Sequence, residues 1–218
     1  MSKGISSVLE DNDDSSIVDI RCKIPGLINA SVFNQNSLVN FPVTESGDIF
    51  SISLLDDGDT DYYVDIKNKR VLLRSDFNVP LIKDAIQDKT RIDLSIPFIQ
   101  GLLKKEAKIL LISHLGRPKN EKDTNLSLKP IFKYLQEKIE NKIHFYSDKI
   151  TNDTKERISF LNSSEIIFFE NIRFNEGEIK NDENFAKNLS SIADIYINDA
   201  FSCSHRMQAS VHKIAKFV

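Results

Sequence analysis

The chain has 218 residues, of which 40% are hydrophobic and 28% charged, as is typical of a globular protein of one or two domains. No apolar run reaches the roughly 18 to 20 residues that cross a bilayer, and the amino terminus lacks the apolar core of a signal peptide. The two cysteines have no CxxC spacing, which argues against a disulfide framework or a zinc site and favours the reducing cytoplasm.

The net charge of −3 is shared unevenly along the chain. Residues 1–62 hold three Lys/Arg against eleven Asp/Glu, a net charge of −8, so the remaining residues carry +5. A basic body behind an acidic leader indicates that the body binds anions and the leader does not.

Residues 1–58 form a separate acidic extension in this interpretation, either β-rich or partly disordered. The stretch "DIFSISLLDDGDTDYYVDI" resembles two strands around an Asp-Gly turn, which predicts a hairpin. No group of residues in the extension has the pattern of a catalytic site, so its role stays open.

From residue 69 onward, five apolar runs of strand length follow one another, beginning at Arg70, Lys108, Lys142, Glu165 and Asp194. Amphipathic helical patterns lie between several of them, in "RIDLSIPFIQGLLKKEA", "LSLKPIFKYLQEKIE" and "ENFAKNLSSIA", and "TKERISFL" predicts a short helix. Nearly continuous apolar strands alternating with helices predict an α/β protein, a Rossmann-like three-layer sandwich with a parallel sheet.

Polar side chains follow four of the five predicted strands. The set is Asp76 and Asn78 after the first, His114, Gly116 and Arg117 after the second, Arg173 after the fourth, and His205 and Arg206 after the fifth, with Arg91 opening the helix after the first strand. Ligands of open parallel sheets bind beyond the carboxyl ends of the strands, so we expect these residues to meet at one edge.

This combination points to a small anion. The planar fork of arginine holds phosphate or carboxylate through two parallel bonds, and a glycine lets backbone amides approach an anion closely. Asp76 and Asn78 are the acceptors suited to hydroxyl groups. The expected ligand is therefore a phosphorylated hydroxy acid, and the absence of GxxxxGK[ST] and GxGxxG patterns argues against a nucleotide site in this chain.

Several single residues have ordinary structural interpretations. Cys203 and His205, two positions apart, are weak support for a thiol nucleophile and its base. His144 is expected to pack within a strand and His212 to lie on a helix face. A nucleic-acid binder is disfavoured because the basic groups sit at strand ends and the net charge is negative.

Four motifs in order, "RVLLRSDFNVP", "SHLGRP", "ENIRF" and "NDAFSCSHR", resemble those of the phosphoglycerate kinase family, over residues 59–218. The resemblance implies a cytoplasmic glycolytic transferase that moves a phosphoryl group between 1,3-bisphosphoglycerate and ADP, giving 3-phosphoglycerate and ATP, with Mg2+ accompanying the nucleotide. It also implies two Rossmann-like domains, the first for phosphoglycerate and the second for ATP or ADP.

The resemblance further assigns roles to residues. It implies substrate binding by Asp76, Phe77, Asn78, Arg91, His114, Leu115, Gly116, Arg117, Arg173 and Arg206. In that assignment His114, Arg117, Arg173 and Arg206 hold the phosphate, Asp76 and Asn78 contact the glycerate, and Arg91 stabilises charge on the transferring group as the catalytic residue. No metal site is expected in this chain, and a monomer that binds neither membrane nor nucleic acid is expected.

Three departures from the family pattern shape the expectations. Gln208 stands where the family commonly has a histidine, and the leader is foreign to the family. The sixth strand of the first domain and the nucleotide domain are not among the 218 residues, so we expect a truncated amino-terminal domain over residues 59–218, with one edge strand missing and no turnover alone. The alternative is a non-catalytic phosphoglycerate-binding module.

Overall fold

The computed structural model describes residues 66–119 and 123–217 in full, and before them the backbone of five short strands. These are β1 (Ile17–Asp19), β2 (Ala30–Asn34), β3 (Ser37–Val39), β4 (Phe50–Ser51) and β5 (Tyr63–Asp65). Most of the acidic extension thus lies outside the described residues, as does the Asp-Gly turn of the predicted hairpin. The hairpin pairing itself is wrong, because β4 pairs with β2 and β5 pairs with β1.

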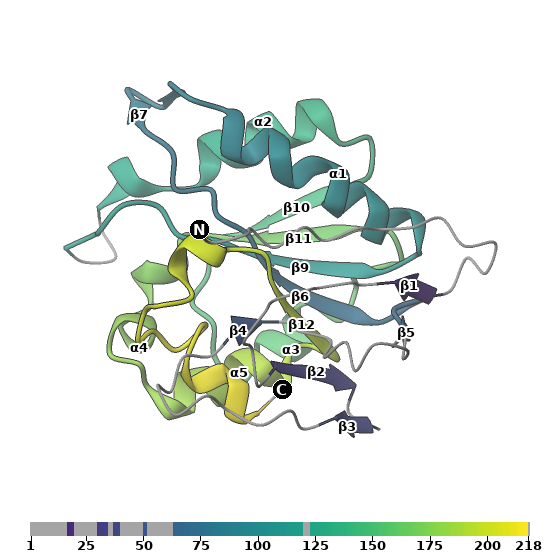
Figure 1. The fold of residues 1–218 in the computed structure, drawn as a ribbon. Helices are drawn as coiled ribbons and strands as arrows, with labels where there is room; N and C mark the ends of the chain where they lie inside the picture. Colours follow the sequence, from purple (N-terminus) through teal and green to yellow (C-terminus); the bar gives the residue numbers. More distant parts are fainter. Residues whose placement is uncertain are drawn as a thin grey trace, which may run out of the picture.

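A five-stranded parallel sheet forms the centre of the molecule (Figure 1). Its strands are β6 (Arg70–Arg74), β9 (Lys108–Ile112), β10 (Ile143–Tyr146), β11 (Ile166–Phe169) and β12 (Ile195–Asn198), in the spatial order β10-β11-β9-β6-β12. All five coincide with the apolar runs identified in the sequence. The register pairs Val71 with Ile109 and with Ile195, so aliphatic residues of three strands form rows across the sheet.

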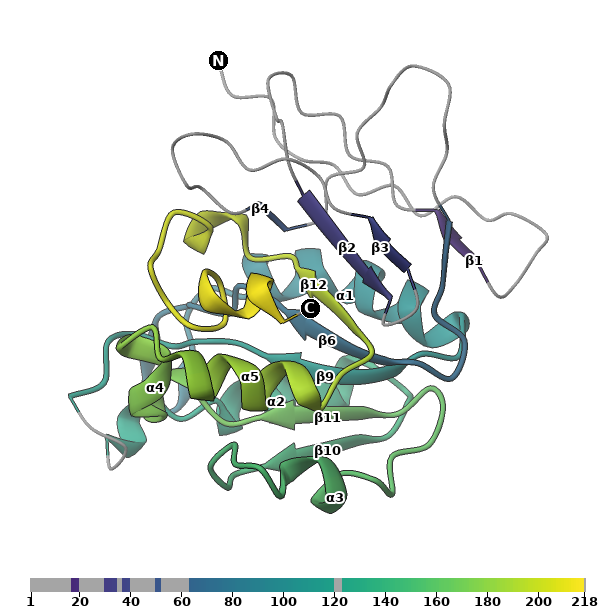
Figure 2. The ribbon, with the colours of Figure 1, turned by 90° about the horizontal axis from the view of Figure 1, so that it is seen from below.

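Helices cover both faces of this sheet, which confirms the predicted three-layer α/β fold (Figures 1 and 2). On one face lie α1 (Thr90–Lys104) and α2 (Lys129–Lys138); on the other lie α3 (Thr154–Arg157) and α5 (Glu183–Ser191). Neighbouring strand residues serve opposite layers: Val71 and Leu73 belong to the core under α1 and α2, and Leu72 to the core under α5. Burial on both faces explains why the strands are nearly continuous apolar runs.

Short elements follow the strands at the carboxyl edge. A hairpin of β7 (Leu81–Ile82) and β8 (Ala85–Ile86) precedes α1, and the one-turn segments η1 (Thr124–Leu126), η2 (Ile172–Phe174), α4 (Glu176–Ile179), η3 (Phe201–Cys203) and η4 (Lys213–Lys216) complete the described chain. His212 lies in the turn just before η4, with its Nδ1 2.9 Å from Asn181 Nδ2, so the predicted helix face is wrong. His144 packs in β10 against the ring of Phe160, as expected.

Candidate functional site

The segments that follow β6, β9, β11 and β12 meet at the carboxyl edge of the sheet and are joined by side-chain hydrogen bonds. Asn78 Oδ1 accepts from the backbone of Gly116 at 2.9 Å, and Asp76 accepts from Ser202 at 2.5 Å. Arg173, after β11, contacts the segments after β9 and β12: it donates to the Gly116 carbonyl at 2.5 Å and to Gln208 Oε1 at 3.2 Å. The predicted convergence of the four strand ends is therefore present in the structure.

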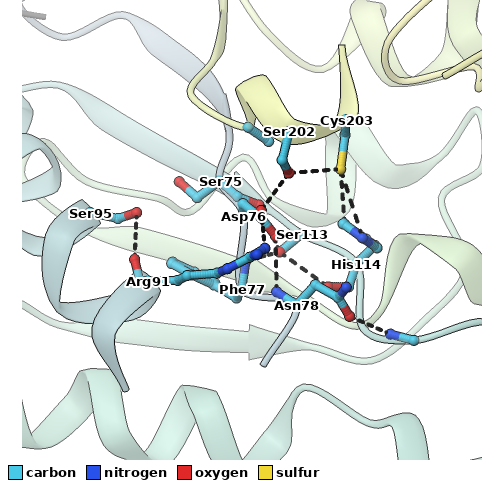
Figure 3. Close-up of polar contacts among 12 residues, drawn as sticks. Ser75, Asp76, Phe77, Asn78, Arg91, Ser95, Ser113, His114, Ser202 and Cys203 are labelled. Atoms are coloured by element: carbon cyan, nitrogen blue, oxygen red, sulfur yellow. Dashed lines mark hydrogen bonds and ion pairs between the residues drawn. The ribbon is translucent and has the colours of Figure 1, made fainter. Parts of the chain in front are cut away.

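The first part of the site is an acidic centre with its own cation (Figure 3). Arg91 Nη1 donates to Asp76 Oδ2 at 2.5 Å, and the backbone amide of Asn78 donates to Asp76 Oδ1 at 3.1 Å. Burial raises the pKa of Asp76, but the hydrogen bonds from Ser202 and Asn78 and the charge of Arg91 outweigh it, so the pKa lies below its ordinary value. Asp76 is thus an ionised acceptor.

Gly116 is placed where a side chain does not fit. Its φ of +57° lies in the left-handed region, and a Cβ would come within 2.8 Å of Leu126 Cδ2. The backbone there serves two partners, since the amide donates to Asn78 and the carbonyl accepts from Arg173. The glycine therefore joins the two parts of the site through its backbone.

The three polar residues of the motif "ENIR" have different roles in the structure. Glu170 accepts from the amide of Leu128 at 2.7 Å and so holds the start of α2. Asn171 is completely buried, and its Nδ2 donates to the carbonyls of Leu115 and Leu126 at 2.8 and 2.9 Å. Both residues hold the loop after β9 in place, which leaves Arg173 to face the site.

The second part of the site is rich in arginine. Arg173 is 6% exposed and Arg206 half-buried, while Arg117 is exposed. The Nε atoms of Arg173 and Arg206 are buried without a hydrogen-bond partner among the described residues. Burial and the charges of Arg206 and Arg74 lower the pKa of Arg173 from its ordinary value. An anion placed among these groups would meet unpaired donors in a desolvated setting.

His114 belongs to this part, although it does not contribute a charge. Burial first, and then the charges of Arg173, Arg74 and Arg206, lower the pKa of His114 to about 3. Its ring nitrogens lie 3.9 and 3.8 Å from the sulfur of Cys203, which is buried (Figure 3). The positive charge at this strand end therefore comes from the surrounding arginines in the ligand-free protein, since burial and those arginines disfavour a proton on His114.

Three predicted residues are placed differently from the rest. Phe77 is completely buried and packs edge-on against Phe168 at 5.8 Å, and Leu115 is 2% exposed. Their side chains thus belong to the core, and only their backbones border the site. His205 is exposed, and Cys203 has His114 as its neighbour, so the structure does not bring Cys203 and His205 together as a nucleophile and base.

Arg74 is a residue of the site that the motif analysis missed. It is the last residue of β6 and fully buried, and among the described residues its Nη1 and Nη2 have no hydrogen-bond partner. Its Nε donates to Ser210 Oγ at 3.0 Å. A charged group at the end of an otherwise apolar run was the available signal, because buried arginine is rare unless it is paired.

A scan against protein-family models matches residues 61–218 to "PGK: Phosphoglycerate kinase". The chain belongs to the phosphoglycerate kinase family. Curated relatives include the phosphoglycerate kinases of Wolbachia sp. subsp. Drosophila simulans (49% identical over 154 residues) and of Coprothermobacter proteolyticus (44% over 155 residues). Each match covers 71% of this chain, and the chain spans 38% of the first relative and 39% of the second.

Solved phosphoglycerate kinase structures share the fold. The enzyme from Coxiella burnetii superposes with a TM-score of 0.63 at 33% identity, covering 70% of this chain and 38% of that one. The enzyme from Pyrococcus horikoshii OT3 gives a TM-score of 0.61 at 30% identity, covering 68% and 38%. The site residues described above all lie within residues 61–218, the portion that the family model matches.

None of the helices among the described residues is long and apolar enough to cross a membrane. No group of three or more His, Cys, Asp or Glu residues in the described part of the chain could hold a metal ion.

Proposed function

We propose that this chain binds 3-phosphoglycerate or 1,3-bisphosphoglycerate at the carboxyl edge of its sheet, as the substrate-binding half of a phosphoglycerate kinase. The observation that carries the proposal is a cluster of buried and half-buried arginines, Arg74, Arg173 and Arg206, none of which pairs with a carboxylate among the described residues. Buried charges are normally paired, so unpaired ones at the ligand-binding edge indicate an anionic ligand.

The two parts of the site suit the two ends of such a molecule. The phosphate takes the arginine-rich part, where Arg173 and Arg206 have free donors and Arg117 is exposed. The hydroxyl and carboxyl end takes Asp76 and Asn78, with Arg91 beside them. Phosphoryl transfer asks the protein mainly for positioning and for stabilisation of charge, and neither task requires a nucleophile here.

Arg91 is the residue we assign to the transferring group. Its side chain is 52% exposed and is held by a single ion pair to Asp76. Exposed ion pairs contribute about 0 to 1 kcal/mol, so an incoming phosphoryl group of higher charge can draw the guanidinium away at little cost. Asp76 would keep its bonds from Ser202 and the Asn78 amide during that exchange.

The nucleotide has a separate place in this proposal. We assign ATP or ADP, with Mg2+, to a nucleotide-binding domain outside these residues, as the family resemblance implies. Turnover then needs that domain to close over the phosphoglycerate and exclude water. The 218-residue chain alone is accordingly expected to bind substrate without phosphorylating it.

Calorimetric titration of the whole chain with 3-phosphoglycerate tests the binding step. We expect specific binding that falls at least about 100-fold in Arg173→Ala, because two charge-assisted bonds of about 1.5 to 3 kcal/mol each are lost. Arg157→Ala is the matched control, since Arg157 pairs with Asp148 on an exposed surface. Equal affinity of the wild type and Arg173→Ala would overturn the proposal.

A turnover assay separates the kinase half from the non-catalytic module. The chain alone should show no ATP-dependent phosphorylation of 3-phosphoglycerate. Adding the separately produced nucleotide-binding portion of a family member should restore measurable turnover if the chain is half of an enzyme. Binding that persists while complementation fails would favour the non-catalytic module.

A further inference from the structure

A buried carboxylate lies behind the arginine-rich part of the site. Glu178, in α4 directly after the segment that carries Arg173, is completely buried. Its Oε2 accepts from the backbone amide of Ser210 at 2.7 Å, and its Oε1 accepts from Ser210 Oγ at 2.7 Å. Its backbone carbonyl also accepts from Ala209 at 3.1 Å. A carboxylate buried this deeply is costly unless its partners are fixed.

Ser210 transmits the position of that carboxylate to Arg74. The hydroxyl has one proton, which it gives to Glu178, so its lone pairs are left for a donor. Arg74 Nε is that donor, at 3.0 Å. Arg74, Ser210 and Glu178 are all fully buried, and Tyr196 secures the Ser210 carbonyl from the other side at 2.5 Å. The three side chains form one continuous chain of hydrogen bonds.

The same bonds hold the segment after β12. Arg206 and Gln208 lie four and two residues before Ser210, and Gln208 accepts from Arg173. Glu178 thus ties together three pieces of chain that supply cations to the site: the end of β6, the loop after β11 and the segment after β12. Each piece comes from a different part of the sequence, so local folding alone does not set their separation.

We propose that Glu178 is a positioning residue for the anion site, acting through Ser210 on Arg74 and on the segment that carries Arg206 and Gln208. This inference rests on the proposed function and adds to it the group that sets the spacing of the arginines. The serine between Glu178 and Arg74 matters, because a carboxylate bonded directly to the guanidinium would occupy the donors. With Ser210 in between, Nη1 and Nη2 stay unpaired while Nε is held.

The sign of the effect distinguishes positioning from simple electrostatics. Glu178 lies near enough to Arg173 for its charge to raise the pKa of that guanidinium. Removing the charge makes the site more positive, which by itself would strengthen anion binding. We expect the opposite: Glu178→Gln should bind 3-phosphoglycerate at least about 10-fold more weakly. Glu176→Gln, on the same short helix but exposed and paired with Lys180, is the matched control and should leave the affinity unchanged.

A double-mutant cycle tests whether the effect passes through the serine. Ser210→Ala removes the hydroxyl but keeps the backbone amide that donates to Glu178. If the two act as one unit, the double variant should bind no more weakly than the poorer single variant. Additive losses, or an affinity for 3-phosphoglycerate in folded Glu178→Gln equal to that of the wild type, would overturn the inference. If Glu178→Gln does not fold, Ser210→Ala decides the question alone. Wild-type affinity for 3-phosphoglycerate in Ser210→Ala would then overturn the inference.

A ligand-free measurement keeps this inference separate from the proposed function. The NMR signal of the Arg74 Nε–H group reports its bond to Ser210 without any ligand. It should move in both Glu178→Gln and Ser210→Ala, where this bond is weakened or lost, and should stay in place in Glu176→Gln. If the wild type fails to bind 3-phosphoglycerate, the proposed function fails. If the signal does not move, the positioning inference fails.

Discussion

Strand β6 carries an arginine at each end, and the two have opposite surroundings. Arg70, at the amino end, donates from Nε and Nη2 to both carboxylate oxygens of Asp194, at 3.0 and 2.5 Å. Arg74, at the carboxyl end, is buried more deeply, yet only its Nε is bonded, and to a neutral hydroxyl. One strand thus shows the difference between a cation that holds the fold together and one kept for a ligand.

The contrast extends along both edges of the sheet. At the amino edge, Lys67 pairs with Glu106, as Arg70 does with Asp194. At the carboxyl edge Arg173 bonds to a carbonyl and an amide oxygen instead of a carboxylate. Neutral acceptors orient a guanidinium and leave its charge uncompensated. An anion is therefore stabilised most by the charges at the carboxyl edge, apart from the corner where Asp76 already pairs with Arg91.

Exchanging each β6 arginine for methionine should separate the two roles, and its effect on binding is the largest expected among the tests of this contrast. Arg74→Met should weaken 3-phosphoglycerate binding about 10- to 100-fold, because a full charge near the anion contributes on the order of 1.4 to 2.8 kcal/mol at an effective dielectric constant of about 20. Arg70→Met should leave binding unchanged and lower the free energy of unfolding, since Asp194 loses its partner. Calorimetry and urea unfolding of both variants provide the measurements. Equal losses of binding in the two variants would contradict the division of roles between Arg70 and Arg74.

The pH dependence of the free energy of unfolding should reveal the lowered pKa of His114. Its pKa is about 3 in the folded protein and about 6.5 when unfolded, so the unfolded state binds more protons between these values. The contribution of this group is fully present above pH 6.5 and is lost as the pH falls towards 3. Since one pKa unit corresponds to about 1.4 kcal/mol, the loss reaches a few kcal/mol. His114→Asn should flatten this part of the profile in urea unfolding measured from pH 7 to pH 4.

Ligand binding should shift the pKa of His114 in the opposite direction, upwards. A phosphate dianion among Arg173, Arg74 and Arg206 offsets the charges that depress the pKa of His114. NMR titration of the imidazole should show its pKa rising when 3-phosphoglycerate is bound, with proton uptake at mildly acidic pH. An unchanged pKa in the saturated complex would place the phosphate elsewhere.

The outline of the fold was predictable because burial on both faces of the sheet leaves a clear trace in the sequence. Strands such as Ile109–Ile112 are unbroken aliphatic runs, and "ENIR" and "SHLGRP" mark where such runs end. The low pKa of His114 was not predictable, because it depends first on burial in the tertiary fold and then on arginines from three distant segments. Glu178 was hidden for the same reason: "EGE" reads as an exposed acidic turn, and only the tertiary fold shows that one of its two glutamates is buried.

Gly116→Ala should have a moderate effect that joins the two parts of the site. A residue with a Cβ is strained at a φ of +57°, and the new methyl group would meet Leu126 at 2.8 Å. We expect a loss of roughly 1 to 3 kcal/mol in the free energy of unfolding. Because the Gly116 backbone serves both Asn78 and Arg173, binding should weaken as well. A variant that is destabilised but binds normally would show that this backbone link is not needed for the ligand.

Gln208 provides the finest test of the contrast between oriented and compensated arginines. Its Oε1 accepts from Arg173, and the resemblance to the family implies a histidine at this position. In Gln208→His, the neutral imidazole at pH 8 can still accept that bond, so the affinity for 3-phosphoglycerate should match the wild type. In the complex at pH 6 the bound phosphate offsets the neighbouring arginine charges and favours a proton on this imidazole, which then no longer accepts from Arg173 and adds a cation beside the anion. We expect binding about two- to fivefold tighter than in the wild type at that pH, equivalent to less than about 1 kcal/mol. If the variant instead binds more weakly at pH 6, the orientation of Arg173 by a neutral acceptor matters more than an additional charge.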